Sequence, residues 1–161
     1  MRRDDVYANK SGYFGPTAGT AITRSGQNIH RPSEFQIQAS LFEWVAWNKG
    51  KYPELELLHA IPNGEYRHPA TAAKLKKQGV RAGVSDIFLP VARRGYHGVY
   101  IEIKAPNGRL SSAQKEWIEM VQREGFYAAV CYGTDAAVQL LEWYLNKQEA
   151  LQDEIRHVVI P

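Results

Sequence analysis

The chain has 161 residues, a length that fits one domain with a substantial core and is too short for two. Its hydrophobic fraction of 44% and charged fraction of 23% are typical of a globular protein and exclude a largely disordered one. The formal net charge of +3 favours polyanionic partners only mildly. The single cysteine, Cys131, excludes an internal disulfide and a cysteine-based zinc site, and it fits a reducing cytosol.

Signals for membrane insertion or export are not evident. No apolar stretch reaches the roughly 18 residues of a membrane span. Arg2 and Arg3 are not followed by an apolar segment, so they do not predict a secretory signal. We therefore expect a cytoplasmic protein without a membrane partner.

Residues 1–32 differ in composition from the rest. They are rich in Gly, Ser, Thr, Asn and Arg and show no sustained apolar period, which predicts an extended or mobile N-terminal arm. Tyr7, Tyr13, Phe14 and Ile22 could dock this arm onto the domain or onto a second subunit. We expect residues 33–161 to form a single ordered domain.

From residue 33 onward, helical and strand patterns alternate. Ser33 and Gln36 form a capping-box pattern ahead of a first helix that should end near Asn48–Gly50. The next elements are predicted in this order: a strand over 55–61, a short basic helix over 69–78, strands over 87–91 and 99–104 around a turn at 92–96, a helix over 111–124, a strand over 126–132, a helix from 133 onward, and a tail over 157–160 that could add an edge strand. This order predicts an α/β or α+β domain with a central mixed sheet flanked by helices.

The two strands around Arg94 bring acidic residues together. If they form an antiparallel hairpin centred on Arg94, position i pairs with position 188 − i, and Asp86 lies opposite Glu102. Directly opposed residues have Cβ atoms roughly 4.5–5.5 Å apart. Two carboxylates that close on otherwise apolar strands would repel each other, so a cation between them is expected. Strand alternation places Lys104 on the same face as Glu102.

Oxygen ligands of this kind select a hard cation, so the sequence predicts a site for Mg²⁺, with Mn²⁺ able to substitute. Two acids, a metal ion and one ammonium group suit phosphodiester hydrolysis: the metal activates water, and the lysine orients that water or stabilises the charged phosphate. The alternative for Glu102 and Lys104 is a surface ion pair, and for Asp86 a simple turn residue. The apolar neighbours of Glu102 favour a central strand and the functional interpretation.

The same residues resemble a known signature. Gly83-Val-Ser-Asp86, about 15 residues ahead of Ile101-Glu-Ile-Lys104, resembles the PD-(D/E)xK nuclease motif, and the details are similar to the VRR-Nuc (virus-type replication-repair nuclease) family. Ser85 stands where that family usually has proline, a residue that would stiffen the turn. The resemblance covers roughly residues 33–145 and includes these further segments: Glu34–Gln38, Ile61–Gly64, Gly79–Gly83, Ser111–Gln114 before Trp117, and Gly125–Tyr127.

The resemblance implies a restriction-endonuclease-like core and assigns roles to individual residues. It implies that Asp86, Glu102 and the backbone carbonyl of Ile103 bind the metal, and that Lys104 is catalytic. It further implies that Glu34 joins them as a metal or water ligand, although an acid in a first helical turn also favours the helix dipole. Gln114 either only caps its helix or also contacts the catalytic site.

Basic and polar residues near the metal loop are candidates for nucleic-acid binding. They are Lys74, Lys77, Arg81, Asn63 and Arg67. The basic residues could instead form an ordinary solvated helix face. Because this segment leads directly into the loop before Asp86, we favour contacts with phosphates.

The sequence therefore predicts a metal-dependent DNA endonuclease of a bacterial or phage-infected cell, selective for branched DNA such as four-way junctions. Two alternatives remain open: a nuclease-fold module that binds nucleic acid without cutting, and an RNA-directed nuclease. A junction resolvase needs two active sites, so we expect a homodimer. Its apolar pairing surface could come from Leu141, Trp143 and Leu145, if Trp143 and Leu145 lie off the core-facing side of the last helix.

Overall fold

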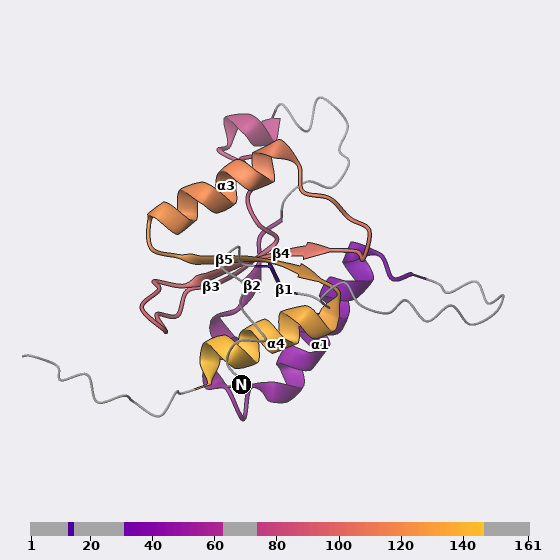
Figure 1. Ribbon diagram of the computed structural model, residues 1–161, viewed down its shortest axis with the longest axis vertical. Coiled ribbons are helices and arrows are strands. Elements are labelled where there is room, and N and C mark those ends of the chain that lie inside the picture. The colour runs from indigo at the N-terminus through magenta and orange to yellow at the C-terminus, as the bar shows by residue number, and fades with distance from the viewer. Residues whose placement is uncertain (1–12, 15–30, 63–73, 147–161) are drawn as a thin grey trace, which may run out of the picture.

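A mixed sheet of five strands lies at the centre of the computed structural model, which describes residues 13–14, 31–62 and 74–146 (Figure 1). The spatial order is β1-β5-β4-β3-β2; β5 runs parallel to β1 and β4, and β3 runs antiparallel to β4 and β2. The bounds of the strands are Tyr13–Phe14 (β1), His59–Ala60 (β2), Ile87–Leu89 (β3), Val99–Lys104 (β4) and Tyr127–Tyr132 (β5).

Helices cover both faces of this sheet (Figure 1). Helices α1 (Glu34–Asn48) and α4 (Thr134–Leu145) lie together on one face, and α3 (Ser112–Arg123) lies on the other. The predicted α/β fold with a central mixed sheet flanked by helices is thus confirmed. No helix within the described residues is long and apolar enough to cross a bilayer.

Both predicted capping boxes are present. At the start of α1, Ser33 Oγ accepts a hydrogen bond from Gln36 N at 3.2 Å, and Gln36 Oε1 accepts one from Ser33 N at 2.9 Å. Ser111 and Gln114 repeat this arrangement at the start of α3. Each box satisfies two of the backbone N–H groups that a helix start leaves without partners, so both helices begin where the sequence predicted.

The β3–β4 hairpin has the predicted register. Ile87 pairs with Ile101 and Leu89 with Val99, so the two numbers of each pair add to 188. The turn itself is closed by a bridge between Arg93 and Tyr96, whose numbers add to 189. Residues 90–92 on one side and 97–98 on the other connect the bridge to the strands, so one extra residue on the β3 side absorbs the difference as a bulge.

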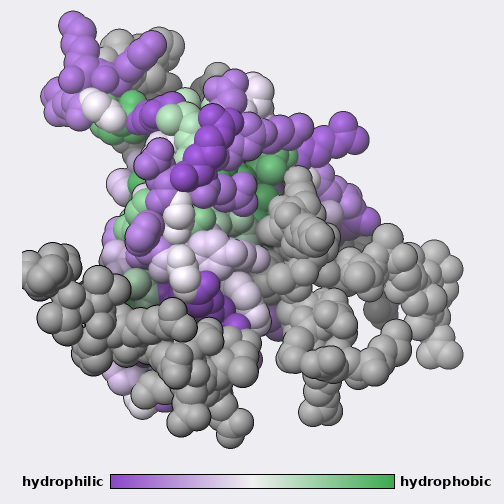
Figure 2. All heavy atoms as spheres, turned by 60° about the vertical axis from the view of Figure 1, so that its left-hand side comes forward, coloured by the Kyte–Doolittle hydropathy of each residue, from purple (hydrophilic) through white to green (hydrophobic). Residues whose placement is uncertain are grey.

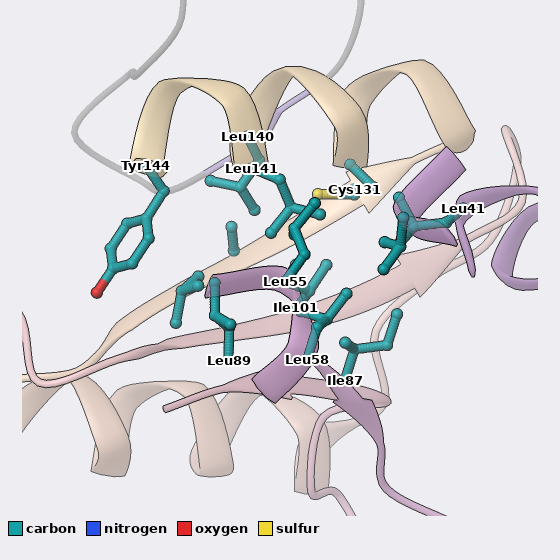
Figure 3. Close-up of a cluster of buried hydrophobic side chains, with 14 of the residues drawn as sticks. Leu41, Leu55, Leu58, Ile87, Leu89, Ile101, Cys131, Leu140, Leu141 and Tyr144 are labelled. Carbon is teal, nitrogen blue, oxygen red and sulfur yellow. The ribbon is translucent and has the colours of Figure 1, made fainter. Parts of the chain in front are cut away.

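The hydrophobic core lies between the sheet and the α1/α4 layer (Figure 3). Ile87, Leu89 and Ile101 project from the sheet into this layer and are fully buried. The predicted core face of α4 is confirmed, because all four of its residues are 0% exposed: Ala137, Leu140, Leu141 and Tyr144. The Tyr144 hydroxyl donates to the Val91 carbonyl at 2.7 Å, which satisfies the one polar group of this face.

The predicted strand over 55–61 is wrong for its first half. Residues Pro53–Leu57 form a 3₁₀ helix (η2), and only His59–Ala60 is strand. Proline at the first position pre-sets a helical φ. Leu55 and Leu58 are buried three residues apart, the period of a 3₁₀ helix, whereas Leu57 is 53% exposed. Strand alternation would have placed residues 55 and 57 on the same side.

The proposed pairing surface on α4 is also wrong. Leu141 and Leu145 are buried in the core, at 0% and 3% exposure. Trp143 packs against Tyr127, with ring centroids 5.0 Å apart, and the Arg94 guanidinium lies 4.5 Å from the centre of its ring. A twelve-residue helix that packs against both α1 and the sheet buries a wider arc than a single stripe, so α4 has no spare apolar face.

Other expectations fall partly on the described residues. Residues 74–77 are helical, and the turn that follows them ends at Gly79, whose φ is +90°. Residues 69–73 of the predicted helix over 69–78 lie outside the described residues. Tyr13–Phe14 of the predicted arm is strand β1, paired with β5. The other docking positions of the arm, Tyr7 and Ile22, and the tail over 157–160 also lie outside the described residues.

Candidate active site

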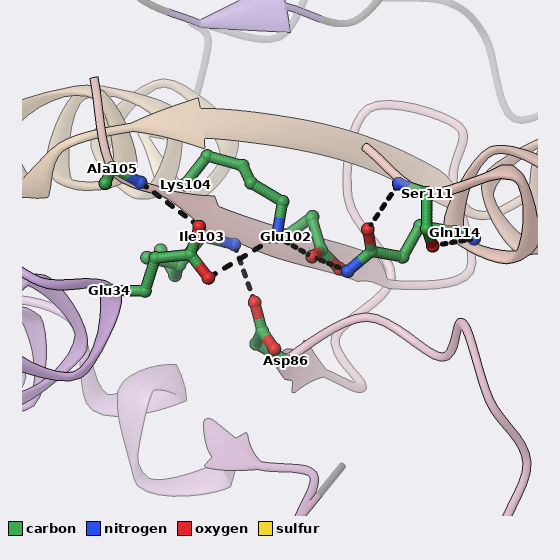
Figure 4. A network of polar contacts seen from close by, with 8 residues as sticks. All are labelled: Glu34, Asp86, Glu102, Ile103, Lys104, Ala105, Ser111 and Gln114. Atoms are coloured by element: carbon green, nitrogen blue, oxygen red, sulfur yellow. Dashed lines mark hydrogen bonds and ion pairs between the residues drawn. The ribbon is translucent and has the colours of Figure 1, made fainter. Parts of the chain in front are cut away.

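Four elements bring polar side chains together at the end of β4 (Figure 4). Glu102 and Lys104 lie on β4 itself, and Asp86 directly precedes β3. Glu34 is the first residue of α1, and Gln114 belongs to the first turn of α3. The structure therefore assembles all five residues that the sequence predicted to be catalytic.

Glu102 is the centre of this network. Its neighbours Ile101 and Ile103 point into the α1/α4 core, so alternation directs Glu102 and Lys104 to the opposite face. Both are nevertheless buried, at 0% and 5% exposure. Lys104 Nζ donates to Glu102 Oε1 at 2.7 Å, and Gln114 Nε2 donates to the same oxygen. The other oxygen, Oε2, is buried and has no hydrogen-bond partner in the described part of the chain.

Asp86 lies one position before β3, and the register of the hairpin sets it opposite Glu102. Its Oδ2 accepts a hydrogen bond from the Ile103 backbone N–H at 2.8 Å. Its own carbonyl accepts from Ile61 N at 2.7 Å, next to the β2–β3 pairing. The side chain is thus anchored to β4 and the backbone to the β2 side, so Asp86 has little freedom to turn away from Glu102.

The carboxylates are held in an environment that opposes their charge. Burial, followed by the negative charge of Asp86, raises the pKa of Glu102 from 4.5 to about 7, although Lys104 acts in the other direction. Burial also raises the pKa of Asp86, more than the hydrogen bond from Ile103 and the charge of Lys104 lower it. The buried acids are therefore destabilised as anions, and added positive charge would relieve this.

Lys104 bridges two carboxylates. Besides Glu102, it reaches Glu34, with 3.5 Å between Nζ and Oε2. Burial lowers the pKa of Lys104, but the hydrogen bond and charge of Glu102, together with Glu34 and Asp86, outweigh it and leave this pKa raised. Lys104 is thus a cation in the resting site. Glu34 Oε1 also accepts from Ala105 N at 3.3 Å, and its side chain is 46% exposed, the most open of the acids.

Gln114 serves its helix and the site at once. Its Oε1 accepts from Ser111 N at 2.9 Å as the capping box requires, so its amide N–H₂ end is the one that faces Glu102. The two interpretations left open by the sequence, cap and site contact, therefore both hold. The side chain fixes which Glu102 oxygen carries hydrogen bonds and which does not.

Gly108 is a site residue that the sequence reasoning missed. A Cβ atom there would lie 3.0 Å from Glu34 Oε1 and 3.0 Å from Lys104 Cδ. Its N–H donates to the Ala105 carbonyl at 2.8 Å, which closes a tight turn after β4. The run Pro106-Asn107-Gly108 is a turn pattern and was the signal available. The missing side chain lets Glu34 and Lys104 approach each other.

Comparisons with known proteins show which family the chain belongs to. The sequence matches the VRR-NUC domain family over residues 30–135, a range that contains all five site residues. The chain belongs to the VRR-NUC family. A solved structure of a VRR-NUC domain protein is 34% identical to it, with a TM-score of 0.60 over 71% of this chain and 88% of that one. None of the proteins with curated descriptions matches the sequence. Membership of this family implies a nuclease-type function and interaction with nucleic acid.

The donor set of this VRR-NUC site fits a hard divalent cation. Glu102 Oε2 is a buried acceptor without a hydrogen-bond donor among the described residues, and Asp86, whose charge acts on Glu102, adds a second carboxylate to the site. Glu34 and the Ile103 carbonyl are the remaining oxygen donors predicted from the sequence. No group of three or more His, Cys, Asp or Glu side chains within residues 31–62 and 74–146 is close enough to hold a metal alone. Mg²⁺ is usually bound through one or two carboxylates and several waters, a requirement that Glu102 and Asp86 can meet without a third acidic side chain.

The candidate nucleic-acid contacts lie partly at the surface of the VRR-NUC domain. Lys74, Lys77 and Arg81 are all exposed. Asn63 and Arg67 lie outside the described residues. In the coloured part of the face drawn in Figure 2, hydrophilic side chains predominate, and hydrophobic atoms show between them.

Proposed function

We propose that this VRR-NUC domain is a Mg²⁺-dependent endonuclease that hydrolyses phosphodiester bonds in DNA and prefers branched DNA, including four-way junctions. The observation that carries the proposal is the asymmetry of Glu102. One oxygen of this buried carboxylate accepts from Lys104 and Gln114, while the other has no donor among the described residues, and the negative charge of Asp86 helps to raise the pKa of Glu102. A residue kept only for stability would have both oxygens satisfied.

Glu102 Oε2, Asp86 and the Ile103 carbonyl would hold the metal directly, and Glu34 would join them through a bound water, since no three acidic side chains among the described residues lie close enough to hold it together. When bound, Mg²⁺ supplies Lewis-acid activation of water and neutralises charge that develops on the phosphate. The Ile103 N–H orients Asp86, and Gln114 together with Lys104 orients Glu102. These contacts preorganise the carboxylates, so the site does not have to rearrange when negative charge builds up.

Lys104 contributes the positive charge that the chain itself provides. Its raised pKa keeps it protonated near neutral pH, so it acts as a hydrogen-bond donor rather than as a general base. From its position between Glu102 and Glu34, it can donate to the attacking water or to a phosphate oxygen. Glu34, the most open of the acids, is suited to accept a hydrogen bond from that water.

A substrate panel tests the proposal directly. The protein is incubated with single-stranded, duplex, flapped and four-way-junction DNA and with matched RNA, in Mg²⁺, in Mn²⁺ and in EDTA. We expect cleavage in Mg²⁺ and Mn²⁺ but not in EDTA, fastest on branched DNA. Cleavage of RNA alone would establish the RNA-directed alternative, and binding without cleavage in any metal would establish the non-cutting one.

We further propose that two copies act together, because one domain offers one such site and a four-way junction requires two cuts. The face of α4 is excluded as the pairing surface by its burial. Light scattering at micromolar concentration should give twice the 18.2 kDa chain mass. A monomer mass that persists when junction DNA is added would contradict the dimer, and equal rates on junction and linear duplex would contradict the branch preference.

A further inference from the structure

The segment before Asp86 lies along one side of α3. Gly83 has a φ of +87°, and a Cβ atom there would overlap the backbone carbonyl of Ala113 in the first turn of the helix. Two residues earlier, Arg81 Nη2 donates to Met120 Sδ at 3.3 Å, and its guanidinium lies 5.4 Å from the centre of the Trp117 ring. Ala113, Trp117 and Met120 are spaced i, i+4, i+7, which is one stripe of a helix. The segment therefore docks on α3 at two points.

Trp117 contacts β4 as well as Arg81. Tyr100 of β4 meets it edge-on, with ring centroids 5.7 Å apart and an interplanar angle of 90°. Its indole Nε1 is buried without a hydrogen-bond partner in the described part of the chain, although a buried indole N–H usually finds one. The Trp117 ring thus contacts both Arg81 and Tyr100, while its own donor has no partner among the described residues.

We propose that Trp117 and Met120 are positioning residues that hold the Arg81 guanidinium as a fixed fork for a backbone phosphate of the bound nucleic acid. This rests on the proposed function and deepens it, since it identifies the contacts that orient one of the basic residues toward a phosphate. A guanidinium has five N–H donors in a planar fork that matches two phosphate oxygens, and stacking on a ring keeps that fork in place. Arg81 is exposed, and its bond to Met120 uses only one of these donors.

The position of Arg81 determines which phosphate it can reach. Arg81 lies five positions before Asp86, so its backbone lies at most about 17 Å from that of Asp86. Phosphates follow one another at about 3.4 Å along the axis of each strand of a duplex. A phosphate held by Arg81 would therefore lie near the cleaved bond, on the same stretch of nucleic acid. Because α3 also carries Gln114, the same helix connects this contact to Glu102.

The test measures binding in the absence of metal, so its outcome is independent of whether the protein cuts DNA. Fluorescence anisotropy of a labelled DNA junction is recorded in EDTA over a series of salt concentrations. Arg81→Ala should weaken binding about tenfold, and the slope of log affinity against log salt should fall by about one. Arg81→Lys should keep the slope, because the charge remains, but lose part of the affinity because the fork is lost.

Trp117 is tested by a pair of variants. Trp117→Leu should weaken binding with the salt slope unchanged, and Trp117→Phe, which keeps an aromatic face, should restore most of the affinity. A purely structural role would lower the melting temperature of both without this difference in binding by the folded protein. The matched control is Arg123→Ala, which removes an equal charge from the far end of α3, where Arg123 pairs with Glu119 at 3.5 Å. Its affinity should stay within about twofold of the wild type.

Two results would overturn the proposal. One is wild-type affinity for Arg81→Ala, which would make the Arg81 contacts purely structural. The other is an equal loss in Arg81→Ala and Arg123→Ala, which would reduce the effect to general charge. If the wild-type protein does not cleave DNA but the binding results are as expected, only the proposed nuclease activity is contradicted, and the role of Arg81 stands.

Discussion

Successive side chains of β4 point to opposite faces of the sheet, and the two faces differ in what burial does to them. Toward α1 and α4, Ile101 and Ile103 are buried among other apolar side chains. Toward α3, Glu102 and Lys104 are buried to nearly the same extent, at 0% and 5% exposure. Burying an aliphatic side chain contributes about 1.5–3 kcal/mol to stability, whereas burying a charge opposes folding unless it is well paired.

Residues that are buried to the same extent can therefore have different roles. The apolar face would stabilise any domain of this topology. The polar face retains two carboxylates whose pKa values are raised by burial, with one oxygen of Glu102 unpartnered among the described residues. Groups kept in a state that disfavours their own charge are typical of functional sites. Substitutions on the two faces should therefore separate activity from stability.

The largest effect is expected on the polar face. Asp86→Ala, Glu102→Ala and Lys104→Ala should each reduce Mg²⁺-dependent cleavage by about a hundredfold or more, because each group acts on charge that develops in the transition state. Circular dichroism should show a native fold in all three. Near wild-type cleavage by any one of them would refute the role of that residue.

On the apolar face, the loss should appear in stability instead. Ile101→Ala should lower the free energy of unfolding by about 2–5 kcal/mol, measured by urea denaturation, because it leaves a cavity in a fully packed core. The conservative control Ile101→Val should lose only about 0.5–1.5 kcal/mol. Cleavage per folded molecule should fall far less than in Glu102→Ala; a comparable fall would remove the distinction between the faces.

The raised pKa of Glu102 predicts a pH effect on both metal binding and stability. Below its pKa of about 7, a proton competes with Mg²⁺, so the half-saturating Mg²⁺ concentration should rise about tenfold per pH unit and level off above it. Without metal, the raised pKa means that protonation of Glu102 stabilises the folded state. The contribution of Glu102 to the unfolding free energy should therefore be largest below about pH 4.5 and be lost as the pH rises through about 7. Glu102→Gln should lack this component of the decline, and an identical profile would contradict it.

The smallest effect concerns Asp86 alone. In EDTA, Asp86→Asn should leave the melting temperature unchanged or raise it, since the repulsion with Glu102 is removed and the amide oxygen can still accept from Ile103 N. Excess Mg²⁺ should then raise the melting temperature of the wild type by linkage, and that of the variant much less. Equal shifts in both proteins would place the metal elsewhere.

Local patterns predicted those parts of the fold that depend on short-range chemistry. The capping boxes at Ser33 and Ser111 and the bounds of β4 follow directly from neighbouring residues. The hairpin register was predicted from the turn position alone, and it holds because a bulge compensates for the one-residue shift at the bridge. Asp86, Glu102 and Lys104 are grouped by that register, so they could be predicted as well.

What the sequence did not predict depends on contacts between distant residues. A run of leucines after Pro53 is compatible with a strand or a 3₁₀ helix, and packing against the core decides between them. The burial of Leu145 depends on how α4 meets α1 and the sheet, which helical spacing alone does not specify. Likewise, Arg81 lies 36 positions before Trp117, and nothing local to either residue indicates that they touch.

The double use of Gln114 limits which residues evolution or design can place there. A capping box accepts Gln or Glu equally well at its third helical position, so at Gln36, which serves only α1, the two should be interchangeable. At Gln114, glutamate would keep the cap but set another carboxylate against Glu102, where the amide now donates. If the first turn of α3 unfolds, Glu102 loses the hydrogen bond from Gln114 and keeps only the one from Lys104. Formation of this helix and full assembly of the proposed catalytic site are therefore coupled, and a chain that has not completed the helix should cleave DNA poorly.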